Sequence, residues 1–410
     1  MTKETIKRID SLFGNVLCAL LTLHRRVVDG AFPRRPAAVA PKKILFLKLI
    51  EQGATVLAAP ALRAAVARVG RENVFFWVFV ENRAIVDILD LIPRENVLEL
   101  RHKNLFVFAA DVLRGLRRIR AAGIDTVVDM EFMARAPAIL AYLTGATWRV
   151  GLHRFTAEGP YRGDLMTHRV QYNPYLHTSR AYSLLVEALG ENPDDLPLVK
   201  IPSRRSEETR HRFVPAAEET ARVLALAGGP GKIVVLNPNT GDLLPLRMWP
   251  TQRFIELGQR ILAAHPEIRL VLTGAPSERE GAEGVARRIG TPDRVRSVAG
   301  KTTLRDVLVL YTLAEVLVTN DSGPGHFASM TDIHNIVLFG PETPQLFGPL
   351  GENRHVLWAG LACSPCVNPY NHRFSPCQNN VCMQSITVDQ VFAEVEAALS
   401  TPVKFAEASP

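Results

Sequence analysis

The sequence predicts an α/β protein built from two successive halves of similar size. Its 410 residues exceed one ordinary domain, since domains usually span roughly 100–200 residues. Apolar stretches of strand length alternate with helical patterns of ten or more residues, as in βαβ units around a parallel sheet. This alternation stops at a polar, Arg- and Glu-rich segment from Ile201 to Gly229 and then starts again. We therefore expect an interdomain connection in that segment.

The first half begins with a short buried strand at Lys43–Leu49 (KILFLKL). This run is apolar, has the length of a strand and ends in a Gly-containing turn. A helical pattern follows at Val56–Val66, and a second apolar run lies at Val74–Val80. The run Thr126–Asp129 (TVVD) is predicted as a further strand that ends in an acid. We place this domain at residues 41–205.

The second half repeats the pattern, starting with a strand at Ile233–Leu236. Its other expected elements are helices at Thr251–Ala264, Ser277–Ile289 and Leu304–Ala314, and strands at Leu270–Thr273, Val316–Thr319 and Ile336–Phe339. We place this domain at residues 230–395. Two α/β halves of this kind are typical of two Rossmann-like domains that face a cleft.

Residues 1–40 differ from the rest and contain an apolar stretch at Leu12–Leu23 (LFGNVLCALLTL). A bilayer span needs about 20 apolar residues, so this stretch is too short, and no cleavage site follows it. Basic residues flank it on both sides, at Lys3, Lys7, Arg8, His24, Arg25 and Arg26. Such flanks suit a helix that lies on an anionic membrane surface. A helix packed on the protein's own surface is an equally good interpretation.

The composition favours anionic partners without choosing among them. The formal charge is +7 and the isoelectric point is near 9.3, which fits nucleic acid, phospholipid headgroups or acidic glycolipids. We find no nucleic-acid recognition motif and expect no such partner.

Four of the five cysteines cluster late, as Cys363-x2-Cys366-x10-Cys377-x4-Cys382. Two Cys pairs at this spacing suit a tetrahedral zinc ion, but we favour free thiols or a disulfide and expect no metal or cofactor.

The sharpest motif is VLVTNDSGPGHFA at Val316–Ala328, in which a strand ends in Asn-Asp and SGPGH opens a helix. The amides at a helix start attract anions, and glycines let a phosphate approach the backbone. Ser322 adds a hydroxyl and His326 a second donor. A plain N-cap by Asp321 or Ser322 is the alternative, and we favour phosphate binding.

A second motif joins a strand end, Leu236–Gly241 (LNPNTG), to Leu246–Pro250 (LRMWP). Thr240 and Gly241 stand where a phosphate can meet them. Arg247 precedes the Trp-Pro that begins the next helix, and its planar fork of donors suits a diphosphate. The alternative is an ordinary solvated loop arginine.

These motifs resemble glycosyltransferase family 9, whose best-known members are the ADP-heptose:lipopolysaccharide heptosyltransferases. Matching segments run from Lys43 to about Leu399, and the most specific are Val298–Leu310, Asn320–Ala328 and Leu338–Gly351. The resemblance implies a GT-B fold and an inverting, metal-independent sugar transfer. It also implies a nucleotide diphosphate sugar as donor, ADP-heptose first, and a lipopolysaccharide core or related cell-surface glycan as acceptor.

The donor site implied by the resemblance lies mainly in the C-terminal domain. Its residues are Thr240, Gly241, Arg247, Asp321, Ser322, Gly323, Gly325 and His326. Arg247 stands where the family commonly has a lysine. The positive charge is therefore kept, but the compact ammonium group is replaced by a planar guanidinium with paired donors.

One position departs from the family pattern. The first turn of the family reads Gly-Asp, and that Asp is taken as the general base; here it reads Gly53-Ala54. An inverting displacement needs a group that accepts the acceptor's proton. Glu51 in the same loop is our first candidate and Glu131 the second. The alternative is a catalytically impaired protein that binds sugar nucleotides or membrane glycans.

Five cations of the first half are candidates for contact with an anionic glycolipid acceptor: Lys48, Arg83, Arg135, Arg149 and Arg154. A rival interpretation, a dinucleotide oxidoreductase, requires G-x-G-x-x-G after the first strand, and EQGATVLAAP lacks it. We therefore predict a cytoplasmic glycosyltransferase that is peripheral on the inner membrane.

Overall fold

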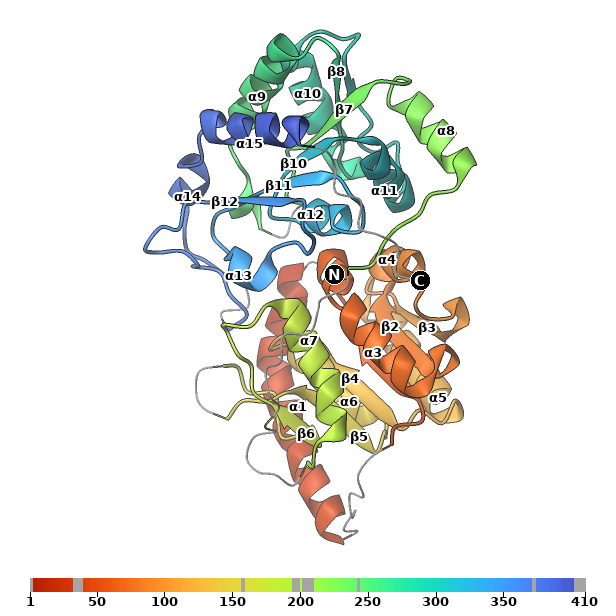
Figure 1. The fold of residues 1–410 in the computed structure, drawn as a ribbon. Helices are drawn as coiled ribbons and strands as arrows, with labels where there is room; N and C mark the ends of the chain where they lie inside the picture. Colours follow the sequence, from red (N-terminus) through yellow and green to blue (C-terminus); the bar gives the residue numbers. More distant parts are fainter. Residues whose placement is uncertain are drawn as a thin grey trace. The chain divides into compact units, whose positions relative to one another are not determined.

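A computed structural model describes residues 3–31, 40–155, 159–193, 200, 210–241, 244–370 and 374–401 (Figure 1). The chain divides into two compact units, each with a sheet of its own. The first comprises Met1–Thr209 and Pro369–Arg373, and the second comprises Arg210–Asn368 and Phe374–Pro410.

The first unit contains a six-stranded parallel sheet in the order β3-β2-β1-β4-β5-β6. Its strands are β1 Ile44–Leu47, β2 Val74–Phe79, β3 Val97–Leu100, β4 Thr126–Asp129, β5 Trp148–Leu152 and β6 His168–Val170. This is the doubly wound order of Rossmann domains, which confirms the predicted α/β class. Every residue of β1 is buried, as expected for a central parallel strand covered on both faces.

Helices cover both faces of this sheet. They are α1 Lys3–Ala31, α2 Gln52–Leu57, α3 Ala59–Val69, α4 Arg83–Leu89, α5 Leu105–Ala121, α6 Arg135–Leu143 and α7 Thr178–Glu187. The helix predicted over Val56–Val66 is divided between α2 and α3, because Pro60 lies in the first turn of α3 and has no N–H to continue a helix. Gly115 lets α5 approach β2, since a Cβ there would lie 2.6 Å from the Trp77 ring.

Helix α1 is longer than its apolar stretch, and one of its faces packs on the first unit. Cys18 is fully buried, and a Cβ on Gly14 would lie 2.8 Å from the Arg135 side chain. The Asp10 carboxylate accepts hydrogen bonds from the backbone N–H groups of Arg135 (3.1 Å) and Ala136 (2.8 Å) at the start of α6. The interpretation as a helix packed on the protein's own surface is therefore correct for this face.

The other face of α1 is apolar and exposed. It carries Leu12, Phe13, Val16, Leu17, Leu20, Leu23 and Val27. These positions share one side of a helix with 3.6 residues per turn. Within the described part of the chain, we find no helix both long and apolar enough to cross a bilayer.

The second unit repeats the same winding, in the order β12-β11-β10-β7-β8-β9. Its strands are β7 Lys232–Asn237, β8 Ile268–Leu272, β9 Val295–Ser297, β10 Val316–Asn320, β11 His334–Phe339 and β12 Arg354–Trp358. Its helices are α8 Ala217–Leu226, α9 Thr251–Ala264, α10 Arg279–Ile289, α11 Leu304–Leu313, α12 Gly323–Ala328, α13 Pro344–Phe347, α14 Val381–Gln384 and α15 Val388–Ser400.

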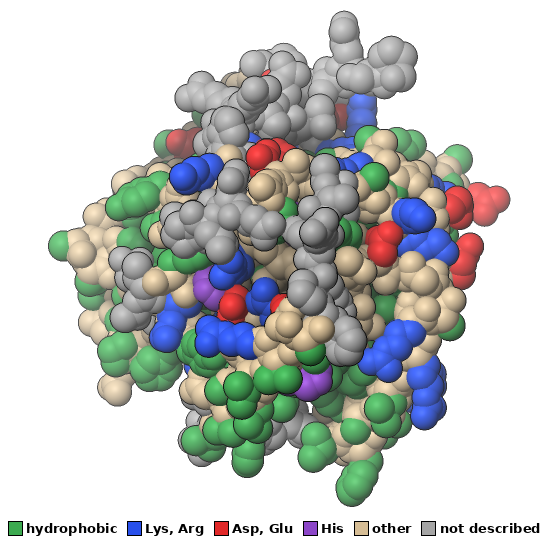
Figure 2. Space-filling model, turned by 90° about the horizontal axis from the view of Figure 1, so that it is seen from below, with side chains coloured by type: hydrophobic (Ala, Val, Ile, Leu, Met, Phe, Trp, Pro, Cys, Tyr) green, Lys and Arg blue, Asp and Glu red, His purple; other side chains and the backbone are tan. Residues whose placement is uncertain are grey.

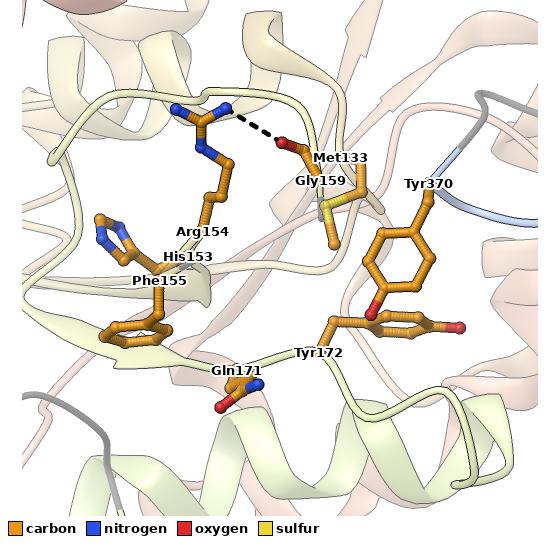
Figure 3. A pocket seen from close by; sticks show the side chains of 8 residues that line it. All are labelled: Met133, His153, Arg154, Phe155, Gly159, Gln171, Tyr172 and Tyr370. Carbon is orange, nitrogen blue, oxygen red and sulfur yellow. Dashed lines mark hydrogen bonds between the residues drawn. The ribbon is translucent and has the colours of Figure 1, made fainter. Parts of the chain in front are cut away.

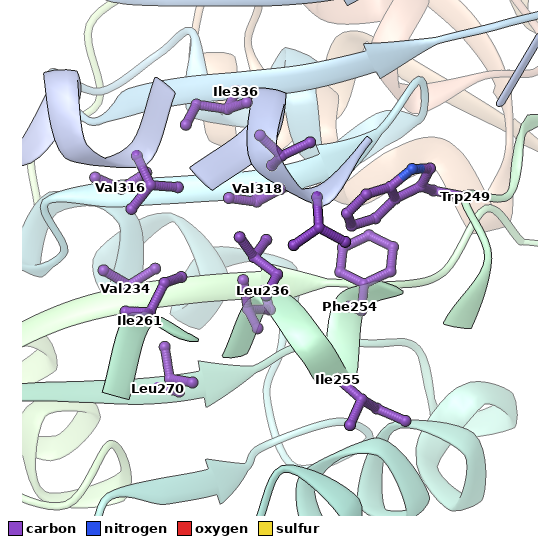
Figure 4. Close-up of a cluster of buried hydrophobic side chains, with 14 of the residues drawn as sticks. Val234, Leu236, Trp249, Phe254, Ile255, Ile261, Leu270, Val316, Val318 and Ile336 are labelled. Carbon is purple, nitrogen blue, oxygen red and sulfur yellow. The ribbon is translucent and has the colours of Figure 1, made fainter. Parts of the chain in front are cut away.

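The core of the second unit lies between β7, β10 and the helices α9 and α15 (Figure 4). Trp249 and Phe254 are fully buried there, with ring centroids 5.0 Å apart in an edge-to-face arrangement. The Trp249 indole N–H donates to the Ile386 carbonyl at 2.8 Å, so the ring is fixed by packing and by a hydrogen bond.

The predicted connection at residues 201–229 differs from the structure. Helix α8 occupies Ala217–Leu226, belongs to the second unit and packs on α11. Its Val223 is buried, and Glu219 accepts from the Ala216 backbone N–H at 2.9 Å, which stabilises the start of the helix. Residues 201–209 lie outside the described part of the chain.

The positive charge is dispersed on the face seen in Figure 2. Lys and Arg side chains stand singly or in small groups among apolar ones. Among the side chains coloured by type there, we see no continuous basic stripe of the kind that tracks a nucleic-acid backbone.

Candidate functional site

The two candidate phosphate loops of the second unit lie together. They follow β7 and β10, which pair side by side at the centre of the sheet. Loops at the carboxyl ends of such strands meet where the strand order reverses, and doubly wound domains bind their ligands there. The topology thus brings Thr240 and Ser322 to one place.

The Asn320 side chain joins these loops. Its Nδ2 donates to the Pro238 and Asn239 carbonyls at 3.1 and 3.2 Å, and its Oδ1 accepts from the Trp249 backbone N–H at 2.9 Å. This side chain is fully buried, so its hydrogen bonds fix the first loop, the second loop and the Trp-Pro turn relative to one another.

The loop after β7 is held by Glu278, which sequence reasoning missed. Its carboxylate oxygens accept from the Gly241 N–H at 3.1 Å and the Ala275 N–H at 2.7 Å. Gly241 has φ +64°, a conformation that favours glycine, and Thr240 is buried beside it. The signal for Glu278 was an acid three residues after Ala275 at the start of a helical turn.

The loop after β10 opens α12, and Ser322 does not cap it. No side-chain capping hydrogen bond is present, and the Ser322 hydroxyl donates instead to the Asn320 carbonyl at 3.1 Å. The alternative of a plain N-cap by Ser322 is therefore wrong. Gly325 lies close to β11, since a Cβ there would be 3.1 Å from the Val337 side chain. Asp321 and His326 are buried in the same turn region.

Arg247 lies between two buried carboxylates. Its Nη1 is 3.4 Å from a Glu342 oxygen and 3.7 Å from an Asp321 oxygen. Its Nε is buried and has no hydrogen-bond acceptor among the described residues. An unsatisfied buried donor is unfavourable unless a ligand oxygen meets it. Sequence reasoning missed Glu342, whose only signal was an acid in the segment Leu338–Gly351.

In the first unit, the loops after β1 and β4 also meet at the centre of the sheet. Leu47 is aligned with Asp129, so the residues that follow them are neighbours. The Lys48 Nζ is fully buried, 3.1 Å from a Glu131 oxygen and 3.8 Å from a Glu51 oxygen. The structure thus brings both candidate bases to one lysine.

The two carboxylates differ in their surroundings. Glu131 is buried, and its second oxygen accepts from the backbone N–H groups of Leu49 (2.6 Å) and Ile50 (3.1 Å). Protein donors therefore occupy both oxygens of Glu131. The Glu51 side chain is 18% exposed, and its backbone has φ 71° and ψ 89°. Such strain in a residue other than glycine often accompanies function.

A buried ion pair between Arg162 and Asp129 lies next to the group formed by Lys48, Glu51 and Glu131. Arg162 donates to Asp129 and to the carbonyls of Ala134 (2.6 Å) and Leu152 (2.8 Å). The other Asp129 oxygen accepts from the Glu131 N–H at 3.0 Å. Burial raises the pKa of Asp129, and the charge of Arg162 opposes that effect. Sequence reasoning missed Arg162, because its role depends on the packing of distant segments.

All five predicted acceptor cations make contacts within the protein. Lys48 contacts Glu131 as described above, and Arg154 donates to the Gly159 carbonyl at 3.2 Å (Figure 3). Arg135 donates to Asn15 of α1 at 2.7 Å, and Arg83 pairs with Glu99 at 2.8 Å. Arg149 is buried and donates to the Leu165 carbonyl at 2.8 Å.

The strand register separates Arg149 from Lys48. Arg149 on β5 is aligned with Val127 on β4, which in turn is aligned with Leu45 on β1. Leu45 precedes Lys48 by three residues, which is about 10 Å along the strand. The structure therefore does not bring Arg149 to the candidate base.

The four late cysteines line one pocket in the second unit. None forms a disulfide, and Ser375 donates to the Cys366 sulfur at 3.3 Å. Burial raises the pKa of the Cys382 thiol. In the described ranges, no three His, Cys, Asp or Glu side chains are grouped so that they can hold a metal ion.

Known proteins resemble this chain in sequence. Lipooligosaccharide heptosyltransferase 2 of Campylobacter jejuni is 25% identical over 173 residues, which are 42% of this chain and 52% of that protein. Lipopolysaccharide heptosyltransferase 1 of Pseudomonas aeruginosa is 24% identical over 377 residues, which cover 88% of this chain and 99% of that protein. The chain spans about half the length of the Campylobacter relative.

A solved structure gives the fold. The Escherichia coli ADP-heptose lipopolysaccharide heptosyltransferase II superposes with a TM-score of 0.67 at 17% identity, over 87% of this chain and 98% of that one. Together with the two parallel six-stranded sheets, this confirms the predicted GT-B fold. The family model described as glycosyltransferase family 9 (heptosyltransferase) matches residues 112–373, more than half of the chain. The protein therefore belongs to glycosyltransferase family 9.

Proposed function

We propose that this protein is an inverting glycosyltransferase that uses a nucleotide diphosphate sugar. ADP-heptose is the first donor to test and lipopolysaccharide core the first acceptor, since the relatives named above are heptosyltransferases. The observation that carries the proposal is Arg247, a cation beside the two loops whose side chain is 11% exposed and whose buried Nε lacks an acceptor among the described residues.

In the proposed complex, the donor diphosphate lies between the loops after β7 and β10. Thr240, Ser322 and His326 supply side-chain donors, while Gly241, Gly323 and Gly325 leave the backbone open to the phosphates. Arg247 donates in pairs to phosphate oxygens, and these replace its contacts with Asp321 and Glu342.

In the proposed transfer, an acceptor hydroxyl oxygen attacks the anomeric carbon from the side opposite the diphosphate. The new C–O bond forms as the bond to the phosphate oxygen breaks, and the nucleoside diphosphate leaves with that electron pair. Glu51 takes the proton of the acceptor hydroxyl, since its carboxylate is the accessible one of the pair. Glu131 holds Lys48 and the loop amides and acts as a positioning residue.

The test is release of nucleoside diphosphate by wild type, Glu51→Gln and Glu131→Gln, with ADP-heptose or other sugar nucleotides and an extracted glycolipid acceptor. Loss of a general base typically costs about 10²–10⁴-fold in rate. We expect that loss in Glu51→Gln, with donor affinity unchanged by calorimetry. Equal turnover in Glu51→Gln and wild type would remove Glu51 from the chemistry. Donor binding without turnover under any pairing would favour the binding-protein alternative.

We also propose that the exposed face of α1 docks on the cytoplasmic surface of the inner membrane. Its seven large apolar side chains lie on one side of the helix, away from the Cys18 side that packs on the protein. Burial of such a face at the headgroup boundary drives interfacial binding. Deletion of residues 1–40 is a poor test, because it also removes Asp10 from the start of α6.

Point substitutions keep the packed face intact. We expect Phe13→Ser with Leu20→Ser to reduce sedimentation with vesicles of anionic phospholipid. A matched control is Leu113→Ser, which removes an exposed leucine from α5 instead. Equal sedimentation of the double variant and the control would contradict membrane docking by α1.

A further inference from the structure

The second unit contains a group of cysteines that none of the roles above uses. All four of them line one cavity of about 120 Å³: Cys363, Cys366, Cys377 and Cys382. The rest of the cavity wall includes the apolar side chains of Leu246, Pro341 and Val381. Side chains that border a cavity can rotate without the strain of overpacking. The surroundings therefore allow these sulfur atoms to change partners.

Two of the cysteines meet at one hydroxyl group. The Ser375 Oγ donates to the Cys366 sulfur at 3.3 Å and accepts from the Cys377 backbone N–H at 3.2 Å. The Cys377 thiol in turn donates to the Asn379 carbonyl at 3.2 Å. Residues 374–380 form neither helix nor strand, so this stretch can shift without breaking a regular element. Cys366 and Cys377 are thus the pair that the contacts bring together for a disulfide.

The four thiols differ in their access to solvent. Cys377 is exposed and Cys366 is partly exposed, whereas Cys382 is only 7% exposed. Burial raises the pKa of the Cys382 thiol, and the three neighbouring cysteines add to that effect. A thiol must be accessible and must ionise before it attacks a disulfide. A small oxidant therefore reacts with Cys377 before it reacts with Cys382.

The segment that carries Cys377 also holds the turn that carries Arg247. The Asn380 Nδ2 donates to the carbonyls of Leu246 at 3.0 Å and Met248 at 2.9 Å. These two carbonyls belong to the residues on either side of Arg247. Because Asn380 is three residues after Cys377, a displacement of Cys377 passes to this turn along a short piece of chain.

We propose that Cys366 and Cys377 form a disulfide in the presence of a low-molecular-weight disulfide such as oxidised glutathione, and that this bond loosens the Arg247 turn. The Cys377 thiolate attacks one sulfur of the oxidant, whose S–S bond breaks as one thiolate leaves. The Cys366 thiolate then attacks the Cys377 sulfur of the mixed disulfide and releases the second thiolate. Two protein thiols are oxidised, the oxidant is reduced to two thiols, and the two protons of the protein thiols go to them. Any effect on donor binding rests on the proposed function, whereas the bond itself does not.

The test compares the reduced full-length protein with the same protein after treatment with oxidised glutathione. Peptide mapping by mass spectrometry identifies the linked cysteines, and hydrogen exchange measures the protection of the amides of residues 246–249. We expect a link between Cys366 and Cys377 and exchange about fivefold faster in that segment, as for the loss of one hydrogen bond. No link, a link between other cysteines, or unchanged exchange would overturn the proposal.

Two serine variants test the assignment of the pair. Cys377→Ser keeps a hydroxyl donor for the Asn379 carbonyl but cannot form the bond, so its amide exchange should not respond to the oxidant. The matched control is Cys363→Ser, which removes an exposed thiol from the same cavity and should respond like wild type. A response in Cys377→Ser, or none in Cys363→Ser, would contradict the assignment.

Failure of this inference is distinguishable from failure of the proposed function. Calorimetry of ADP binding to the reduced protein tests the donor site alone, and we expect the disulfide to lower that affinity about fivefold. If ADP binds equally well before and after the disulfide forms, the coupling is wrong and the transferase stands. If the disulfide forms and speeds amide exchange while no nucleotide binds in either state, the thiol site stands and the transfer is wrong.

Discussion

Substitution of Arg247 tests the proposed donor site most directly, because Arg247 lies beside two carboxylates whose contacts a bound diphosphate would replace. At 3.4 Å, the attraction between Arg247 and Glu342 is about 5 kcal/mol at an effective dielectric constant of 20 and about 1 kcal/mol in water. Charge-assisted hydrogen bonds contribute a net of about 1.5–3 kcal/mol. We therefore expect Arg247→Gln to weaken ADP binding by roughly 10- to 150-fold, at 1.4 kcal/mol per factor of ten.

Two further variants separate charge from geometry. Arg247→Lys keeps the charge but loses the Nε donor, so we expect ADP affinity between those of wild type and Arg247→Gln. Glu342→Gln removes a competing carboxylate, so ADP affinity should rise several-fold, and less so at high salt. Isothermal titration calorimetry at two salt concentrations measures all four proteins. Wild-type affinity in Arg247→Gln, or weaker binding in Glu342→Gln, would refute the reasoning.

Two stability predictions follow from local geometry. Gly115→Ala should lower the melting temperature, because the new Cβ would lie 2.6 Å from the Trp77 ring and overpacking costs about 1–3 kcal/mol. The control is Gly281→Ala, which is also within a helix but has nothing within 4 Å of the new Cβ and should raise the melting temperature slightly. Differential scanning calorimetry of both variants measures the two changes. The hydrogen bond from Arg101 lowers the pKa of Asp111 to about 2, so Asp111 adds stability above its ordinary value of 3.8 and loses it as the pH falls toward 2. The melting temperature of Asp111→Asn should therefore be lower than that of wild type at pH 7 and equal to it near pH 2. A difference in melting temperature that stays constant between pH 7 and pH 2 would contradict this prediction.

The sequence was sufficient to predict the central strands of both sheets, because parallel strands that are buried on both faces are continuous apolar runs. Five of the described strands were missed, namely β3, β5 and β6 in the first sheet and β9 and β12 in the second. The edge strands β9 and β12 escape recognition because their half-exposed residues include polar ones such as Arg296 and Arg354. Helix α8 was missed as well, because its single buried contact, Val223, lies in an otherwise polar segment.

The candidate site was predictable only where a motif is local. The loops that carry Thr240 and Ser322 follow strand ends and could be recognised from sequence. Glu342 could not, since its contact with Arg247 spans 95 residues and depends on the topology. Arg149 shows a second limit, because the sequence does not distinguish a cation that donates to internal carbonyls, as Arg149 does, from one that faces a substrate.

Asp10 has a practical consequence for anyone producing this protein. Helix α6 has no side-chain cap of its own at Ala134, and the carboxylate that meets its first amides belongs to α1, 126 residues before Ala136 in the chain. Loss of such a cap typically costs about 1 kcal/mol. A shortened protein that begins at β1 would therefore lack the carboxylate that caps α6. It would also expose the surface on which Cys18 packs. Purification tags are better fused before an intact α1, or at the other end of the chain.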